Sequence, residues 1–308
     1  MPVDFRTRKI YEYFDIPNVR RLNDHVGLEL EYEGITGDLG DFSDGLYAKG
    51  WRLTADHSLR NNGAEFISVP THINRTQMRI NSLCSVFDQF GKTPSISHRC
   101  STHVHVNVAD KTMRELEAAY FLLLLLEDSL FDRLPSDDRK ENLFALRSSY
   151  YNNALERMIA VSEQNLRNKG NIFLQTEHFS NIKYVGVSVY RTRHIGTVEF
   201  RILPAFRLDQ LEAGELTQWA RVFVALVRGM ANIKTFDPLD AMSEFIEVCN
   251  SGSRSVADFF RQYYEEDSAG ILVNLFDDGE GMLEPENSSV LFFLAEMLSS
   301  HKERYASK

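Results

Sequence analysis

Ser101-Thr-His-Val-His-Val-Asn-Val108 alternates strictly between two kinds of side chain. Because successive side chains of a β-strand point to opposite faces, one face of this stretch is apolar and β-branched. The other face carries the imidazoles of His103 and His105 and the amide of Asn107. The pattern predicts a strand that packs on the core with one side and presents polar groups on the other.

Two other stretches repeat this design, one at residues 26–33 and one at residues 197–203. Each has apolar side chains at alternate positions and charged side chains between them. If the three strands share a sheet, its second face combines carboxylates, imidazoles and a guanidinium. The charged side chains are Glu29, Glu31 and Glu33 in the first stretch and Glu199 and Arg201 in the second.

Composition narrows the class of protein. The chain has 308 residues, of which 43% are hydrophobic, so it can bury a sizeable core in a single domain over residues 1–308. The net charge of -10 argues against direct binding to a nucleic-acid backbone, which needs clustered Lys and Arg. The longest apolar run, residues 118–126, is shorter than the roughly 18 residues of a membrane span. Three scattered cysteines without a C-x-x-C motif fit a reducing compartment, so we expect a cytoplasmic protein without membrane association.

The order of elements predicts an α+β fold with an antiparallel sheet. Strand patterns concentrate in residues 25–110 and 181–204. Helical patterns fill an insertion at residues 111–180 and a C-terminal part at residues 209–304. Runs of strands and runs of helices that do not alternate are typical of α+β architecture. The sheet is therefore expected to assemble from distant parts of the chain.

Local signals predict the individual elements. Thr112 and Glu115 form a capping-box motif, so a helix is expected from there to about residue 131. Asn61-Asn-Gly63 between two β-like runs predicts a hairpin. Further helices are predicted at residues 8–14, 44–49, 74–90, 136–168, 209–232, 238–249, 254–265 and 288–301, with a strand, turn and strand at residues 181–191, 192–196 and 197–204.

The acidic residues of the polar face admit two interpretations. Glu29 and Glu31, two positions apart on one strand, lie about 7 Å from each other and repel. A divalent cation such as Mg²⁺ or Mn²⁺ would relieve that repulsion, because hard cations prefer carboxylate oxygens. The alternative is a solvated strand face. Glu65, after the hairpin turn, could bring another carboxylate beside the first strand.

The basic and polar residues of this face also admit more than one interpretation. His103 and His105 have the spacing of a zinc or other transition-metal site, and also of a site that binds a metal and a phosphate. Arg201 could clamp a phosphate or form a weak surface ion pair with Glu199. Arg191 and Arg193 flank the predicted turn and could reach the same face, whereas Asp56 and Ser58 are more simply explained by a turn.

The ordered set of motifs resembles the amidoligase family of carboxylate–amine ligases, which are related to glutamate–cysteine ligase and glutamine synthetase. The resemblance spans roughly residues 25–230 and is carried by residues 27–31, 51–58, 65–70, 103–105 and 197–201. It implies a glutamine synthetase-like catalytic domain, in which the concave polar face of the sheet binds ATP and Mg²⁺. ATP would phosphorylate a small-molecule or peptide carboxylate, and an amine would then attack the acyl phosphate to form an amide or isopeptide bond.

The resemblance also implies a role for each site residue. Four carboxylates would hold the metal ions: Glu29, Glu31, Glu65 and Glu199. Three residues would act in catalysis, namely Arg201, His105 and Arg191, with His105 the preferred histidine for metal or phosphate contact. Arg193, His103 and Ser58 would help to bind the nucleotide.

Two alternatives to the ligase stay open. One is a zinc-dependent amide hydrolase that uses His103 and His105 as ligands. The other is a non-catalytic binding protein that keeps the fold. The sequence contains no P-loop, no G-x-S-x-G elbow and no H-E-x-x-H motif, so the common nucleotide-binding and hydrolase signatures do not apply.

Overall fold

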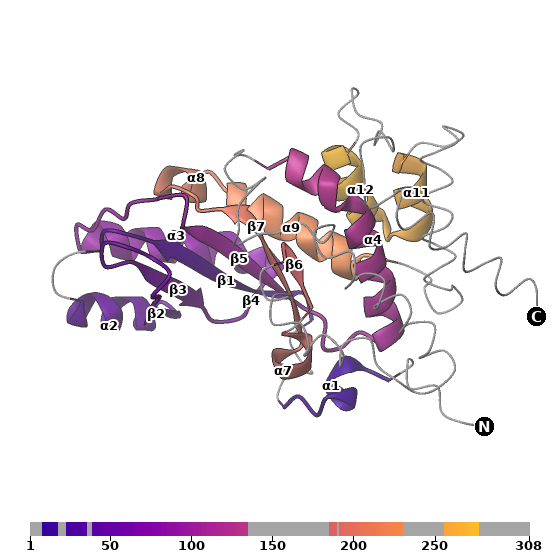
Figure 1. Cartoon of the computed structure of the whole chain (residues 1–308), viewed down its shortest axis with the longest axis horizontal. Coiled ribbons are helices and arrows are strands. Elements are labelled where there is room, and N and C mark those ends of the chain that lie inside the picture. Colours follow the sequence, from indigo (N-terminus) through magenta and orange to yellow (C-terminus); the bar gives the residue numbers. More distant parts are fainter. Residues whose placement is uncertain are drawn as a thin grey trace, which may run out of the picture.

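The computed structural model describes residues 8–17, 23–35, 39–134, 185–189, 191–230 and 256–276. Within these ranges the chain combines an antiparallel sheet with helices, so the predicted α+β fold is confirmed (Figure 1). The helices predicted at residues 136–168, 238–249 and 288–301 lie outside the described residues.

One antiparallel sheet brings together strands that are far apart in the sequence. Its order is β2-β3-β1-β5-β7-β6, and β4 pairs with the start of β1. The central strand β1 thus lies between β3 and β5, both of which pair with it in antiparallel fashion. The strands are β1 (His25–Tyr32), β2 (Trp51–Ala55), β3 (Ala64–Ser68), β4 (Thr71–His72), β5 (Ser101–Asn107), β6 (Val187–Ser188) and β7 (Thr197–Pro204).

The register sets charged residues opposite one another on the polar face. Glu29 of β1 pairs with His103 of β5, and Glu31 pairs with Glu65 of β3. Between β5 and β7 the register shifts, so that the single residue His103 faces two residues of β7. Extra residues of this kind bend a strand and re-aim its side chains, and they are frequent beside functional sites.

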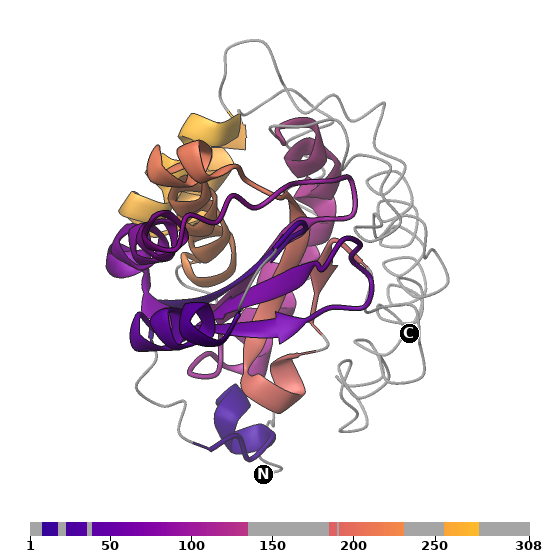
Figure 2. The same ribbon diagram turned by 90° about the vertical axis from the view of Figure 1, so that its left-hand side faces the viewer.

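Helices cover the apolar face of the sheet. Figure 2 shows α3 (Thr76–Gln89) and α9 (Glu215–Arg228) on one side of the strands. Phe66 of β3 packs on Phe87 of α3 with ring centroids 5.1 Å apart, and Phe200 of β7 stacks on Phe223 of α9 at 4.0 Å. Burial of each such ring stabilises the fold by about 1.5–3 kcal/mol, so this packing fixes the orientation of the sheet.

The long helix α4 (Met113–Asp132) begins at the predicted capping box, which is confirmed. The Thr112 hydroxyl accepts a hydrogen bond from the Glu115 backbone amide at 3.2 Å, and the Glu115 carboxylate accepts one from the Thr112 amide at 2.6 Å. α4 packs against α9. None of the helices within the described ranges has the length and apolar character needed to cross a bilayer. The other helices are α1 (Ile10–Tyr13), α2 (Gly40–Ala48), η2 (Ile73–Arg75), α7 (Thr192–Ile195), α8 (Leu208–Glu212), α11 (Val256–Tyr263) and α12 (Glu266–Phe276).

Four local expectations need correction. The turn predicted at residues 192–196 is the short helix α7, which ends at Gly196 in the left-handed region, with φ 71°. Where the structure describes residues 181–191, the only strand is β6. The hairpin between β2 and β3 has a long connection instead of a tight turn, and Asn61 and Asn62 both have positive φ within it. The helix expected at residues 44–49 begins earlier, at Gly40.

Candidate functional site

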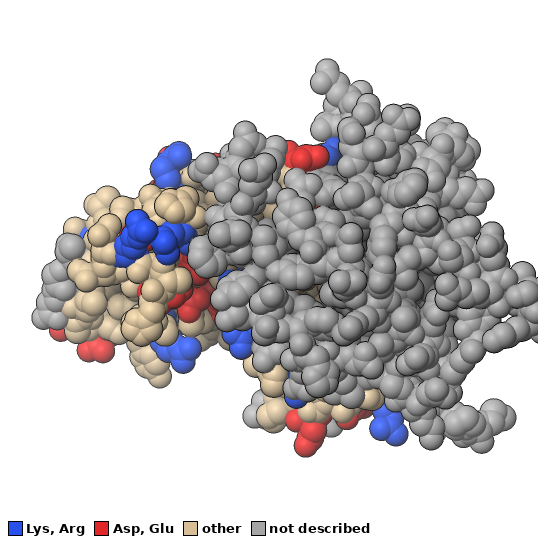
Figure 3. All heavy atoms as spheres, viewed as in Figure 1, with Lys and Arg blue, Asp and Glu red and all other residues tan. Residues whose placement is uncertain are grey.

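Charged side chains from four strands meet on the polar face. They point there because each strand keeps the period of two that its sequence shows. His103 is 3% exposed and Glu199 is 4% exposed, so a solvated strand face does not describe them. Figure 3 shows acidic atoms with Lys and Arg atoms around them in the region of β1, β2 and β3. The acid–imidazole cluster consists of Glu29 and Glu31 from β1, Glu65 from β3, His103 and His105 from β5, and Glu199 from β7.

His103 lies at the centre of the acid–imidazole cluster. Its Nδ1 atom is 3.3 Å from Glu29 Oε2 and 3.6 Å from Glu199 Oε1. Its Nε2 atom is 2.8 Å from Ser101 Oγ and 3.8 Å from Glu31 Oε1. One imidazole therefore touches the carboxylates of three different positions, on β1 and β7.

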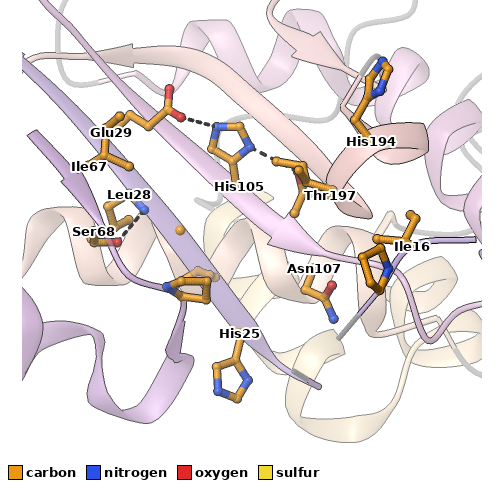
Figure 4. A pocket seen from close by; sticks show the side chains of 15 residues that line it. Ile16, His25, Leu28, Glu29, Ile67, Ser68, His105, Asn107, His194 and Thr197 are labelled. Carbon is orange, nitrogen blue, oxygen red and sulfur yellow. Dashed lines mark hydrogen bonds and ion pairs between the residues drawn. The ribbon is translucent and has the colours of Figure 1, made fainter. Parts of the chain in front are cut away.

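His105 joins the acid–imidazole cluster to the far end of the sheet. Its Nε2 atom is 3.1 Å from Glu29 Oε1 and 4.0 Å from Glu199 Oε1. Its Nδ1 atom is 3.1 Å from Thr197 Oγ1, which fixes the orientation of the ring (Figure 4). Burial lowers the pKa of His105, but the adjacent Glu29 carboxylate and the charge of Glu199 outweigh it, so the pKa is raised above its ordinary value.

The pKa values of Glu29 and Glu65 are shifted in opposite directions. Burial raises the pKa of Glu29, but hydrogen bonds and charges from His103 and His105 outweigh it, and the pKa lies well below its usual range. Burial and the negative charges of Glu29 and Glu31 raise the pKa of Glu65 to about 8. Glu29 is therefore ionised at neutral pH. Glu65 is surrounded by other negative charges, which a bound cation would neutralise.

The donor atoms fit a divalent cation. Two groups each place three ligand atoms within 4.8 Å of one another. The groups share His103, and their four other members are all carboxylates. Carboxylate oxygens with few nitrogens suit Mg²⁺ or Mn²⁺ better than zinc. The two ligand groups are Glu29, His103 and Glu199, and Glu31, Glu65 and His103.

The predicted basic residues lie at different distances from the acid–imidazole cluster. Arg201 Nη1 donates to Glu199 Oε1 at 2.6 Å, so its guanidinium contacts the acid–imidazole cluster directly. Arg191 is exposed at the start of α7, and its charge acts on His105. Arg193 is half-buried within α7.

The structure does not bring Ser58 into the acid–imidazole cluster. Ser58 is exposed in the connection between β2 and β3. Its amide donates to Asp56 Oδ1 at 2.8 Å, and its carbonyl accepts from Arg99 Nη1 at 2.9 Å. Asp56 and Ser58 thus take part in a turn, which was the simpler interpretation of the two residues. The structure shows no contact of Ser58 that would support nucleotide binding.

Two residues of the site, Ser101 and Thr197, were not predicted from the sequence. Ser101 supplies its amide and its hydroxyl to Glu31 Oε2, at 2.8 and 2.5 Å, and contacts His103 as well. Thr197 orients His105. Each stands two positions before a site residue, on the same strand face, so the alternation that found His103 and Glu199 could also have found them.

A cavity of about 400 Å³ lies next to the acid–imidazole cluster. Glu29 and His105 form part of its wall, and Gly27, Ile67 and Thr197 belong to its lining. Figure 4 shows Glu29 and His105 facing each other beside it. This volume lies within the range of about 300–1,000 Å³ that is typical of small-molecule sites.

Fold and site together define an α+β protein with buried carboxylates and imidazoles on one face of an antiparallel sheet. A family model described as "putative amidoligase enzyme" matches residues 43–227. Because the match covers more than half of the 308 residues, the chain belongs to this amidoligase family, and the resemblance seen in the sequence is confirmed. The family is one of ligase-type enzymes that join a carboxylate to an amine. No curated protein matches the chain.

The matched segment contains most of the site. Glu65, His103, His105, Glu199 and Arg201 all fall within residues 43–227. The first strand, with Glu29 and Glu31, precedes the matched segment, and only the pairing of β1 with β3 and β5 shows that it completes the acid–imidazole cluster.

Proposed function

We propose that the protein is an ATP- and Mg²⁺-dependent carboxylate–amine ligase, which forms an amide or isopeptide bond through an acyl-phosphate intermediate. The observation that carries this proposal is the pair of cation ligand groups that share His103, in a chain of the amidoligase family. Acyl-phosphate formation depends mainly on charge neutralisation and in-line positioning. A floor of carboxylates with nearby guanidinium groups is suited to that task.

Four residues would hold Mg²⁺ in this proposal: Glu29, Glu31, Glu65 and Glu199. Bound Mg²⁺ would supply positive charge that neutralises phosphate oxygens. The raised pKa of Glu65 supports this assignment, because a carboxylate surrounded by other carboxylates holds a proton until a cation takes its place.

The reaction divides into two balanced steps. A carboxylate oxygen of the acid attacks the γ-phosphorus of ATP, the bond to the β-phosphate oxygen breaks, and ADP leaves. The amine nitrogen then attacks the acyl carbon, inorganic phosphate leaves and the nitrogen loses a proton. Arg201, ion-paired to Glu199 at the edge of the acid–imidazole cluster, would orient a phosphate, together with Arg191 at the N-cap of α7 and Arg193 within that helix. The protein needs no nucleophile of its own.

The direct test measures ADP release with pooled carboxylates and amines in the presence of Mg²⁺. We expect ADP to form only when both an acid and an amine are present, with a product mass equal to their condensation. Glu199→Gln should lower the rate by about 100-fold or more, because it removes a ligand of the Mg²⁺ that would neutralise the phosphate charge. Glu266→Gln, which removes the same charge from an exposed position of α12, should leave the rate unchanged.

ADP release that does not require Mg²⁺, or that does not require an amine, would contradict the ligase proposal.

A zinc-dependent amide hydrolase is the second candidate, because His103 and His105 both lie within 3.3 Å of the Glu29 carboxylate. Elemental analysis separates the two: stoichiometric zinc in the purified protein supports the hydrolase. If the protein only binds ligands, no ADP should form with any pair of acid and amine, either in the wild type or in Glu199→Gln.

A further inference from the structure

The cavity beside the acid–imidazole cluster differs in character from the cluster itself. It lies where β1 begins, between the cluster and α7. Among the lining residues that the structure describes, Glu29 is the only one with a formal charge apart from the histidines. Most of the remaining wall is apolar or uncharged. The apolar residues of the wall include Ile16, Pro17, Ile67, Pro70 and Ile195.

Gly27 keeps this cavity open. It lies on β1, pairs with His105, and shares the polar face with Glu29 two positions later. A Cβ atom at this position would meet only His105 Cβ, at an ordinary contact distance of 3.5 Å. Neighbouring packing therefore does not require a glycine here. A glycine inside a strand weakens it and often marks a place where a ligand approaches the backbone closely.

We propose that this cavity binds the carbon body of the amine substrate, and that this amine is a primary amine with an apolar, uncharged chain or ring. The inference rests on the proposed ligase function. The described residues of the lining include no Lys or Arg that could hold a carboxylate, and the carboxylate of Glu29 repels one. The apolar wall favours a hydrocarbon body, while the inner end of the cavity opens at the cluster where the amine nitrogen is needed.

Size-matched ligands test the chemical class. Phenethylamine and phenylpropionate have similar bodies and opposite charges, so calorimetry with both, with and without Mg²⁺, separates an amine site from an acid site. We expect phenethylamine to bind at least about tenfold more tightly than phenylpropionate. Equal affinity, or preference for the acid, would overturn the assignment.

A cavity-filling substitution tests the location. Gly27→Leu adds a side chain to the floor of the cavity without removing any charged group of the acid–imidazole cluster. We expect it to weaken phenethylamine binding by about tenfold or more. Gly270→Leu is the matched control, because Gly270 is exposed in α12 and has no atom within 4 Å of an added Cβ. Unchanged affinity in Gly27→Leu would place the amine elsewhere.

Ile195→Asp keeps the test decisive if Gly27→Leu does not fold. Ile195 is 47% exposed at the end of α7, so the fold tolerates a charge there. The new carboxylate should weaken phenethylamine binding and strengthen the binding of hexamethylenediamine, whose second ammonium it can pair with. If neither affinity changes, the cavity is not the amine site.

The outcomes also separate this inference from the ligase proposal. Binding of phenethylamine that Gly27→Leu weakens, without ADP release for any acid, supports the cavity assignment and contradicts the ligase. ADP release whose amine KM is the same in Gly27→Leu and in the wild type supports the ligase and contradicts the cavity assignment.

Discussion

Glu65 is the residue at which the electrostatics of the acid–imidazole cluster are least balanced. Its partner across the strand pair is another carboxylate, Glu31, and Glu29 lies near enough to raise its pKa further. The histidines that stabilise the charge of Glu29 lie on β5, on the other side of β1. In the absence of a cation, Glu65 therefore keeps its proton up to about pH 8.

This imbalance predicts how Glu65→Gln changes stability with pH. Folding raises the pKa of Glu65 from 4.5 to about 8, so its contribution to stability is complete below about pH 4.5 and is lost as the pH rises through about 8. Without added metal, Glu65→Gln should therefore raise the stability at about pH 9 by about 1 kcal/mol, or about 2–4 °C in Tm. At about pH 5, where the wild-type side chain is already neutral, the two proteins should melt together. Thermal melts at both pH values provide the measurement, and an equal difference at both would show that charge is not the cause.

Residues of the site divide into those that the sequence could identify and those that it could not. The alternation in β1, β5 and β7 was enough to place Glu29, His103, His105 and Glu199 on polar faces. It could not show that Ser58 turns away, because loop residues have no period that fixes their direction. Nor could it show that His103 belongs to both ligand groups and His105 to neither, since that depends on the register between strands.

At the scale of the element, the start of α4 shows a signal that the sequence carries in full. Four backbone amides at a helix start lack partners within the helix, and a capping box satisfies two of them. Thr112→Ala should lower the free energy of unfolding by about 1 kcal/mol. Thr112→Ser keeps the hydroxyl and should recover most of that loss. Urea denaturation measures both variants, and an equal loss in the serine variant would point to the lost methyl group instead of the cap.

The sequence does not predict the short helix α7 or the bounds of β6, for a physical reason. α7 has four residues and the described part of β6 has two, so neither is long enough to show a hydrophobic period. Gly196 ends this segment with a left-handed φ of 71°, a conformation that suits glycine. What precedes it is a helical turn because tertiary contacts outweigh weak local propensity in such short segments.

At the scale of the whole molecule, the site exists only because distant segments pair. β1 lies between β3 and β5, and β7 joins β5 from almost one hundred residues further along the chain. The sequence predicted that these strands share a sheet, but their order and register depend on long-range packing, such as the contact of Phe200 with Phe223. The acid–imidazole cluster is thus a property of the folded state alone, and a cation that binds it should stabilise folding.

Stabilisation by Mg²⁺ is the last prediction, and it joins the acid–imidazole cluster to the stability of the whole chain. A ligand that binds only the folded state stabilises it by RT ln(1 + [L]/Kd), about 2.7 kcal/mol at a 100-fold excess over Kd. Because Mg²⁺ must displace the proton of Glu65, its affinity should fall by up to about tenfold per pH unit below about 8. The shift in Tm on adding Mg²⁺ should therefore be larger at about pH 9 than at about pH 6.

Two variants make this linkage specific to the acid–imidazole cluster. Glu65→Gln should show a smaller Mg²⁺ shift that no longer depends on pH over this range, since the proton in competition is gone. Glu266→Gln, at an exposed position of α12, should retain the wild-type shift and its pH dependence. A shift that is equal in all three proteins would mean that Mg²⁺ acts on the general surface charge of this acidic chain. A loss confined to Glu65→Gln would tie the cation to the sheet face where β1, β3, β5 and β7 meet, because Glu65 lies there beside the carboxylates of Glu29 and Glu31.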